Sequence, residues 1–202
     1  LLAAEDDNFA NHHGVDPGSL LRAAAQILKT GRIQTGGSTI TMQVAKNFFL
    51  SSERSFSRKA NEILLALQIE RELTKDEILE LYINKIYLGN RAYGIEAASQ
   101  VYYGKSIREI SLAEMAMIAG LPKAPSRFNP IVNPTRSMER RNWILGRMFK
   151  LGRISEQDYK EAVAEPLSAR LHIAAPDIYA PYIAEMARAE MVGKFGGQAY
   201  TD

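Results

Sequence analysis

The sequence contains no cysteine and no long apolar run among its 202 residues. The absence of cysteine excludes a disulfide scaffold, thiolate zinc sites and a cysteine nucleophile. A membrane-spanning helix needs about 18–20 consecutive apolar residues, whereas the best candidate, residues 112–121, is short and contains Glu114. Neither sign of charge dominates, because 25 basic residues are nearly balanced by 23 acidic ones. The overall charge therefore does not favour a nucleic-acid partner.

Helix signals are dense along the chain, whereas strand signals are few. Capping boxes at residues 74–77 and 111–114 mark two helix starts, since each pairs a Ser or Thr with a Glu three residues later. A further half-buried helix is expected over residues 57–73. Its apolar positions are Ala60, Ile63, Leu64 and Leu67. The clearest strand signal is residues 171–173, so the sequence predicts a mostly α fold.

An acidic segment with two histidines lies near the start of the chain, at residues 5–16. One interpretation is a solvated turn. The other is that Glu5, which follows four apolar residues, is a partly desolvated carboxylate whose pKa rises until it serves as a general base. A metal site built from His12, His13 and Asp16 is less favoured, because adjacent histidines point in different directions.

A Gly-Gly-Ser-Thr sequence at residues 36–39 opens an expected helix. Free backbone N–H groups and hydroxyls at a helix N-terminus form a natural cradle for a phosphate-type anion. The Lys-Ser/Thr ending of a nucleotide-binding P-loop is missing and no strand precedes the segment, so nucleotide binding is not expected. The alternative is an ordinary helix start, capped by Ser38 or Thr39.

A cluster of cations surrounds a single carboxylate between residues 46 and 62. Its members are Lys46, Arg54, Arg58, Lys59 and Glu62. On a helix, Arg58 and Lys59 lie four and three residues before Glu62, so both basic groups lie beside it. A surface ion-pair lattice would contribute little to stability. The functional alternative is a pyrophosphate clamp, in which cations neutralise the negative charge that develops on a leaving group.

Several other side chains are assigned to packing. Tyr82 and Tyr87 are expected in the core or at its rim, and Glu96 is a candidate buried structural acid. Core positions are also expected for Trp143, Met115, Met117, Met138 and Met148.

The order and spacing of these segments resemble the peptidoglycan glycosyltransferase domain of bifunctional, class A penicillin-binding proteins (glycosyltransferase family 51). Five motifs match in order between residues 5 and 98. They occupy residues 5–16, 36–43, 58–62, 80–89 and 92–98. Met42 stands where the family pattern has another glutamine, which leaves that single contact open.

The resemblance implies a lysozyme-like helical fold of two lobes over residues 1–165, with a membrane-facing jaw at roughly 17–60. Residues 166–202 resemble a linker to a transpeptidase domain that this chain lacks. The implied reaction transfers a growing glycan from its undecaprenyl-pyrophosphate carrier onto lipid II in bacterial cell-wall synthesis. It forms a β-1,4 bond with inversion at the donor anomeric carbon and releases undecaprenyl pyrophosphate. The implied location is the periplasmic face of the inner membrane, with an anchoring helix upstream of Leu1, and the expected inhibitor is moenomycin.

The resemblance also implies residue roles. Glu5 is the general base for the acceptor 4-hydroxyl, and Glu62 is a second acid near the leaving pyrophosphate, where a divalent cation (Mg or Mn) could be held. The residues implied to bind pyrophosphate are Lys46, Arg54, Arg58 and Lys59. Those implied to position the donor sugar or phosphate are Ser38, Thr39 and Gln43. The supporting residues are Asp6, His12, Asn84, Tyr93 and Glu96.

Three alternatives remain open from the sequence. Residues 20–33 are either an interfacial surface for the membrane or an ordinary amphipathic helix packed on the core. A lysozyme-like lytic transglycosylase would use one glutamate as an acid and would not need the cluster at residues 46–62. A helical binding module would use that cluster to hold nucleic acid, but the chain lacks the interleaved basic and aromatic residues that would favour such binding.

Overall fold

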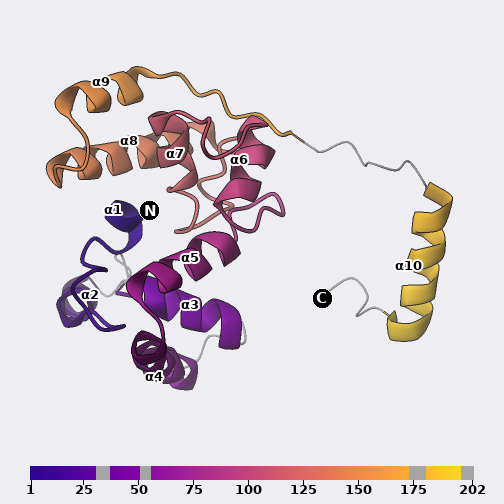
Figure 1. Ribbon diagram of the computed structural model, residues 1–202, viewed down its shortest axis with the longest axis horizontal. Coiled ribbons are helices and arrows are strands. Elements are labelled where there is room, and N and C mark those ends of the chain that lie inside the picture. Colours follow the sequence, from indigo (N-terminus) through magenta and orange to yellow (C-terminus); the bar gives the residue numbers. More distant parts are fainter. Residues whose placement is uncertain (31–36, 51–55, 173–180, 197–202) are drawn as a thin grey trace. The chain divides into compact units, whose positions relative to one another are not determined.

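The computed structural model describes residues 1–30, 37–50, 56–172 and 181–196 (Figure 1). Within these residues the chain forms ten helices and no strand. They are α1 (Leu2–Glu5), α2 (Pro17–Thr30), α3 (Ile40–Phe49), α4 (Phe56–Glu72), α5 (Lys75–Lys85), α6 (Ile95–Tyr103), α7 (Leu112–Ile118), α8 (Pro134–Lys150), α9 (Glu156–Ala164) and α10 (Pro181–Phe195). The mostly α fold class is confirmed. Both capping boxes are also present, at the starts of α5 and α7.

The chain divides into two compact units, residues 1–172 and residues 173–202. The first unit extends to His172 because residues 170–172 are hydrogen-bonded to the end of α6. The N–H of Arg170 donates to the Tyr102 carbonyl (2.9 Å) and that of His172 to the Val101 carbonyl (2.8 Å). The expected strand at 171–173 is therefore wrong for residues 171 and 172, which lie against a helix end, while Ile173 lies outside the described residues. The division into a domain at 1–165 and a linker at 166–202 stays a prediction.

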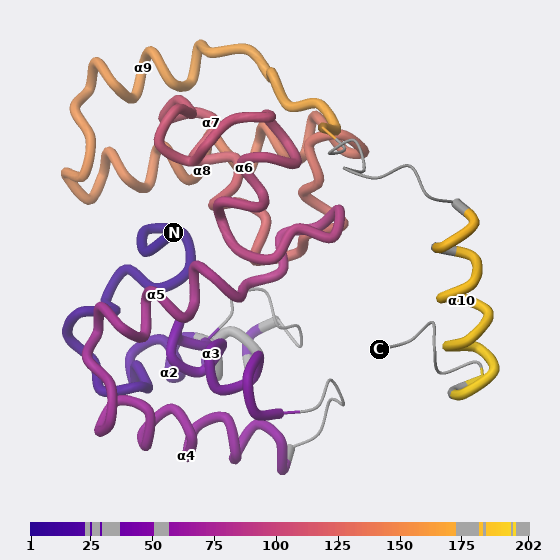
Figure 2. Tube along the Cα trace, turned by 45° about the vertical axis from the view of Figure 1, so that its right-hand side comes forward, coloured from indigo at the N-terminus to yellow at the C-terminus, as the bar shows by residue number. Residues whose placement is uncertain are grey.

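Helices α2–α5 and α6–α9 form two groups within the first unit, as the views in Figures 1 and 2 both show. A larger hydrophobic core extends from α3 and α5 to α6, and a smaller one lies between α7, α8 and α9. Helix α1 lies between the groups, where Leu1 and Ala4 pack against the smaller core. Glu5, the last residue of α1, therefore lies between the groups, where Arg140 of α8 and Gln43 of α3 both contact its carboxylate.

Helix α4 does not bury the face that its apolar residues indicate. Leu64 is 64% exposed and Leu67 is also exposed, whereas Glu62, Ala66 and Ile69 are buried. The helix packs on α3 and α5 through this second face. The half-buried helix expected over residues 57–73 is thus confirmed, but its buried positions differ from the apolar residues that indicated it. Glu62 can be buried because neighbouring cations compensate its carboxylate, which the periodicity of apolar residues does not register.

Gly14 permits the acidic segment to pass close to α4. Its φ is +85°, and a Cβ at this position would lie 2.6 Å from the Ala66 carbonyl oxygen. We expect Gly14→Ala to lower the free energy of unfolding by about 1–3 kcal/mol, because the positive φ and the close approach of the Ala66 carbonyl both disfavour a side chain here. Gly152→Ala is the matched control, since Gly152 has φ +65° but no neighbouring atom within 4 Å. Thermal unfolding followed by circular dichroism should show the larger loss at Gly14; equal losses would contradict the close approach.

Candidate active site

A cleft of about 450 Å³ lies where α1, α3, α4, α8 and the segment after α7 meet. It is lined by Ala4, Glu5, Ser38, Met42, Gln43, Lys46, Arg58, Lys59, Glu62, Pro122, Lys123, Arg140 and Trp143. Seven of the residues singled out from the sequence therefore line one cavity: Glu5, Ser38, Gln43, Lys46, Arg58, Lys59 and Glu62. Arg54 lies outside the described residues.

Glu5 is a largely desolvated carboxylate with polar partners on both oxygens. Arg140 Nη2 lies 3.3 Å from Oε1 and Gln43 Nε2 donates to Oε2 at 3.5 Å. The Tyr82 hydroxyl, which is buried as expected, donates to the other end of the Gln43 amide (3.4 Å). Burial raises the pKa of Glu5 above its usual range, and the Arg140 charge opposes the rise. A carboxylate in this environment suits general-base chemistry near neutral pH.

Glu62 is paired with two cations on the same helix. Its side chain is 4% exposed, with Lys59 Nζ 2.8 Å from Oε2 and Arg58 Nε 3.2 Å from Oε1. Lys59 Nζ also donates to Ser38 Oγ at 2.6 Å, which ties α4 to the start of α3. The spacing argument is confirmed, and burial distinguishes this cluster from an ordinary surface lattice. Lys46 is exposed and adds a third positive charge to the same cleft.

The N-terminus of α3 is capped by side chains of the protein. Thr39 is its N-cap: Oγ1 accepts the N–H of Met42 (3.1 Å) and donates to the Gly14 carbonyl (2.6 Å). The N–H of Ile40 donates to Asp6 Oδ2 at 2.9 Å. These two N–H groups are thus already bonded, which matches the ordinary helix start rather than an open anion cradle. Gly36 lies outside the described residues, and Met42 is buried.

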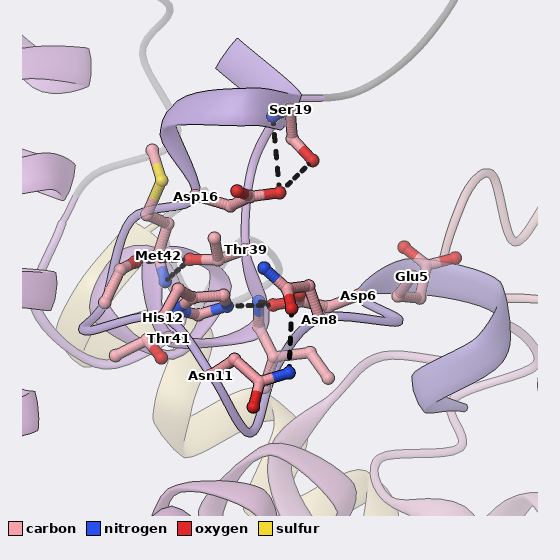
Figure 3. A network of polar contacts seen from close by, with 12 residues as sticks. Glu5, Asp6, Asn8, Asn11, His12, Asp16, Ser19, Thr39, Thr41 and Met42 are labelled. Carbon is pink, nitrogen blue, oxygen red and sulfur yellow. Dashed lines mark hydrogen bonds and ion pairs between the residues drawn. The ribbon is translucent and has the colours of Figure 1, made fainter.

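Asp6 and His12 anchor the acidic segment to α3. His12 Nε2 lies 2.9 Å from Asp6 Oδ2, the same oxygen that accepts the Ile40 N–H. Figure 3 shows this network around Thr39, with Glu5 beyond it at the end of α1. Both Asp6 and His12 are buried. The geometry therefore gives these two residues a supporting position behind Glu5.

The three other supporting residues are not brought into the cleft. Asn84 is exposed and lines a separate hollow beside α3 and α5. Tyr93 is exposed, with its ring centroid 5.1 Å from that of Tyr87, which is exposed as well rather than packed in the core as expected. Glu96 is exposed rather than buried, because it lies on the outer face of the first turn of α6. It accepts the Ile107 N–H at 3.0 Å, and this bond lowers its pKa.

Three charged or aromatic residues of the cleft were not assigned to it from the sequence: Lys123, Arg140 and Trp143. Trp143 was expected in the core but is 52% exposed, and Met115 is exposed as well, whereas Met117 is buried as expected. The Arg140 guanidinium carbon lies 4.5 Å from the centre of the Trp143 ring. The three-residue spacing of Arg140 and Trp143 indicates that they share a helix face. The sequence near them does not indicate that this face lies against Glu5, which is 135 positions away from Arg140.

Glu5 also lines a second hollow of about 240 Å³, together with Ser38 and Trp143. Two cations belong to this hollow, Arg22 and Arg147, and Arg147 is paired with Asp7. Glu5 therefore borders two adjoining cavities, each with cations in its wall.

Comparison with known proteins gives a consistent result. A family model described as Transglycosylase matches residues 1–149. Over 202 residues the chain is 77% identical to penicillin-binding protein 1A of Pseudomonas aeruginosa, covering all of this chain and 25% of that protein. It is 52% identical over 204 residues to penicillin-binding protein 1A of Escherichia coli K12, covering all of this chain and 24% of that protein. The chain thus spans about a quarter of these relatives.

A crystal structure of penicillin-binding protein 1A from Haemophilus influenzae is similar to this chain, with a TM-score of 0.51 and 42% sequence identity. The match covers 78% of this chain and 20% of that one.

Proposed function

The chain belongs to the transglycosylase family, and from that membership we propose that it polymerises lipid II into the glycan strands of the bacterial cell wall. It is a peptidoglycan glycosyltransferase domain of the class A penicillin-binding protein type. The observation that carries the proposal is that one cleft holds two different carboxylates. Glu5 is desolvated and suited to accept a proton, while Glu62 lies among cations suited to a leaving pyrophosphate.

On the acceptor side, Glu5 removes the proton from the 4-hydroxyl of the acceptor sugar. The freed electron pair on that oxygen attacks the anomeric carbon of the donor and forms the β-1,4 bond. The bond from this carbon to the pyrophosphate breaks on the opposite face, so the configuration inverts. Burial supports this role because it raises the pKa of Glu5 and makes its carboxylate a stronger base.

On the donor side, the departing pyrophosphate takes the bonding electron pair. Lys46, Arg58 and Lys59 stabilise its negative charge, and Arg54 joins them by resemblance to the family. A pyrophosphate needs little protonation to leave, so cations replace the acid of a glycosidase. Ser38, which accepts a hydrogen bond from Lys59, helps to hold that cation in place.

A divalent cation (Mg or Mn) beside Glu62 stays a prediction, and the protein groups nearby fit it poorly. Lys59 and Arg58 occupy the two oxygens of Glu62. In the part of the chain that the structure describes, no three His, Cys, Asp or Glu side chains gather as a metal site would require. We therefore derive no step through a metal ion.

The proposal extends to the surroundings of the domain. Its partners are the membrane surface, the undecaprenyl-linked glycan and lipid II, and a transpeptidase domain of the same parent chain, at the periplasmic face of the inner membrane. In α2, the exposed side chain of Leu21 supports contact with lipid, while residues 31–33 lie outside the described part. Among the helices that can be described, none is both long and apolar enough to cross a membrane.

Purified protein should convert lipid II into polymeric glycan and should not solubilise finished cell wall. Gel separation of labelled lipid II products measures the first activity, and release of soluble fragments from purified peptidoglycan measures the second. Fragment release without polymerisation would overturn the proposal in favour of a lytic transglycosylase.

A further inference from the structure

Arg140 is a cation on the base side of the cleft, and it comes from an element distant in sequence. It lies on α8, whereas the pyrophosphate-side cations lie on α3 and α4. Its Nη2 approaches Glu5 Oε1 at 3.3 Å and the Ala4 carbonyl oxygen at 3.4 Å, the latter on the same helical turn. One guanidinium thus contacts both the side chain of Glu5 and the backbone that carries it.

The guanidinium is held in place by its surroundings. Arg140 is 7% exposed. Its guanidinium carbon lies 4.5 Å from the centre of the Trp143 ring and 5.9 Å from that of Phe128. Arg140 differs in this respect from Lys46, which is exposed, so that its side chain can bind the phosphate of an incoming substrate. A buried cation needs a counter-charge, and Glu5 supplies it.

Other charged and titratable groups also face Glu5. They are Lys123 after α7 and the Tyr82 hydroxyl on α5. Burial raises the pKa of Glu5 and so favours its protonated form. The Arg140 charge is the largest of the effects that lower this pKa again. The Lys123 charge also lowers the pKa of Glu5, but its effect is smaller than that of Arg140.

We propose that Arg140 is a positioning residue for the reaction: it keeps the Glu5 carboxylate ionised and directed into the cleft before the acceptor arrives. The inference rests on the proposed function of Glu5 as the base. Without the guanidinium, burial alone would act on Glu5. A larger fraction of the enzyme would then hold a protonated carboxyl that cannot accept the acceptor's proton.

The test is the pH dependence of lipid II polymerisation by the chain with Arg140→Met, which is neutral and of similar length. We expect the acid limb of the kcat/KM profile to move upward by about one to three pH units, the range associated with an adjacent opposite charge. At pH values on the acid side of this limb, kcat of Arg140→Met should be at least about tenfold lower than that of the wild type, with a smaller change in the KM for lipid II. Arg140→Lys keeps the charge and should restore most of the profile. The control is Arg136→Met, which removes an exposed positive charge one turn earlier on the same helix and should leave the limb in place.

A second measurement uses no substrate. Titration of carboxyl-¹³C glutamate by NMR, with the Glu5 signal assigned from Glu5→Gln, should show the Glu5 pKa higher in Arg140→Met than in the wild type. An unchanged titration would overturn this inference alone, whereas a wild-type chain that does not polymerise lipid II would overturn the proposed function instead. If Arg140→Met does not fold, Arg140→Gln, which is also neutral but polar, takes its place. The limb should again move upward because the positive charge beside Glu5 is lost, and an unmoved limb would overturn the inference.

Discussion

Replacing Glu5 by glutamine is expected to reduce lipid II polymerisation by about 10²- to 10⁴-fold, the range associated with loss of a general base. Glutamine has the same shape and keeps an oxygen that can accept from Arg140, but it cannot take up the acceptor's proton. The fold should stay intact, because the Asp6–His12 contact that anchors the acidic segment does not involve Glu5. Continuous polymerisation assays, with circular dichroism as a check on folding, measure both parts of the prediction.

His13→Ala is the control for this substitution. His13 belongs to the same acidic segment but is exposed and does not line the cleft. It should retain wild-type turnover. Substantial turnover by Glu5→Gln would remove Glu5 from the role of base, and a comparable loss in His13→Ala would mean that the segment is merely sensitive to substitution.

The second large effect is expected at the pair Lys59 and Glu62. Lys59→Ala removes a cation that contacts both Ser38 and Glu62. Turnover should fall by about 10²- to 10³-fold, as for loss of one preorganised group that stabilises transition-state charge. Glu62→Gln should also lower turnover strongly, because Lys59 and Arg58 lose the carboxylate that holds them side by side. Steady-state kinetics with lipid II measure both effects.

The surface pair Lys160 and Glu156 on α9 is the matched control. It is also a helical Lys–Glu pair, with a distance of 2.6 Å, but both side chains are well exposed and lie outside the cleft. Lys160→Ala should leave turnover unchanged. It should alter the free energy of unfolding by no more than a few tenths of a kcal/mol, about the contribution of an exposed ion pair. Because Lys59 and Glu62 are in contact, their double variant should lose less than the sum of the single losses. Additive losses would argue that the two residues act separately.

Local features of the site could be predicted from the sequence because they depend on neighbouring residues of one helix. Lys59 and Glu62 meet because residues three apart share a helix face. Thr39 caps α3 because its hydroxyl reaches an N–H three residues later. The half-buried helix over residues 57–73 was also predicted from local spacing. Its buried face was not, because a count of apolar residues assigns Glu62 to the surface, whereas its carboxylate is buried beside Arg58 and Lys59.

The sequence by itself determined the family, the helical class and the identities of the two carboxylates, since these reside in ordered motifs of local spacing. Only the tertiary structure decided what faces them. Arg140 meets Glu5 across 135 positions of chain, and Trp143 joins the cleft instead of the core. Such contacts depend on how α8 packs against α1, and that packing is set by burial summed over the whole unit. The charge environment of the base, and hence its pKa, is therefore a property of the assembled fold.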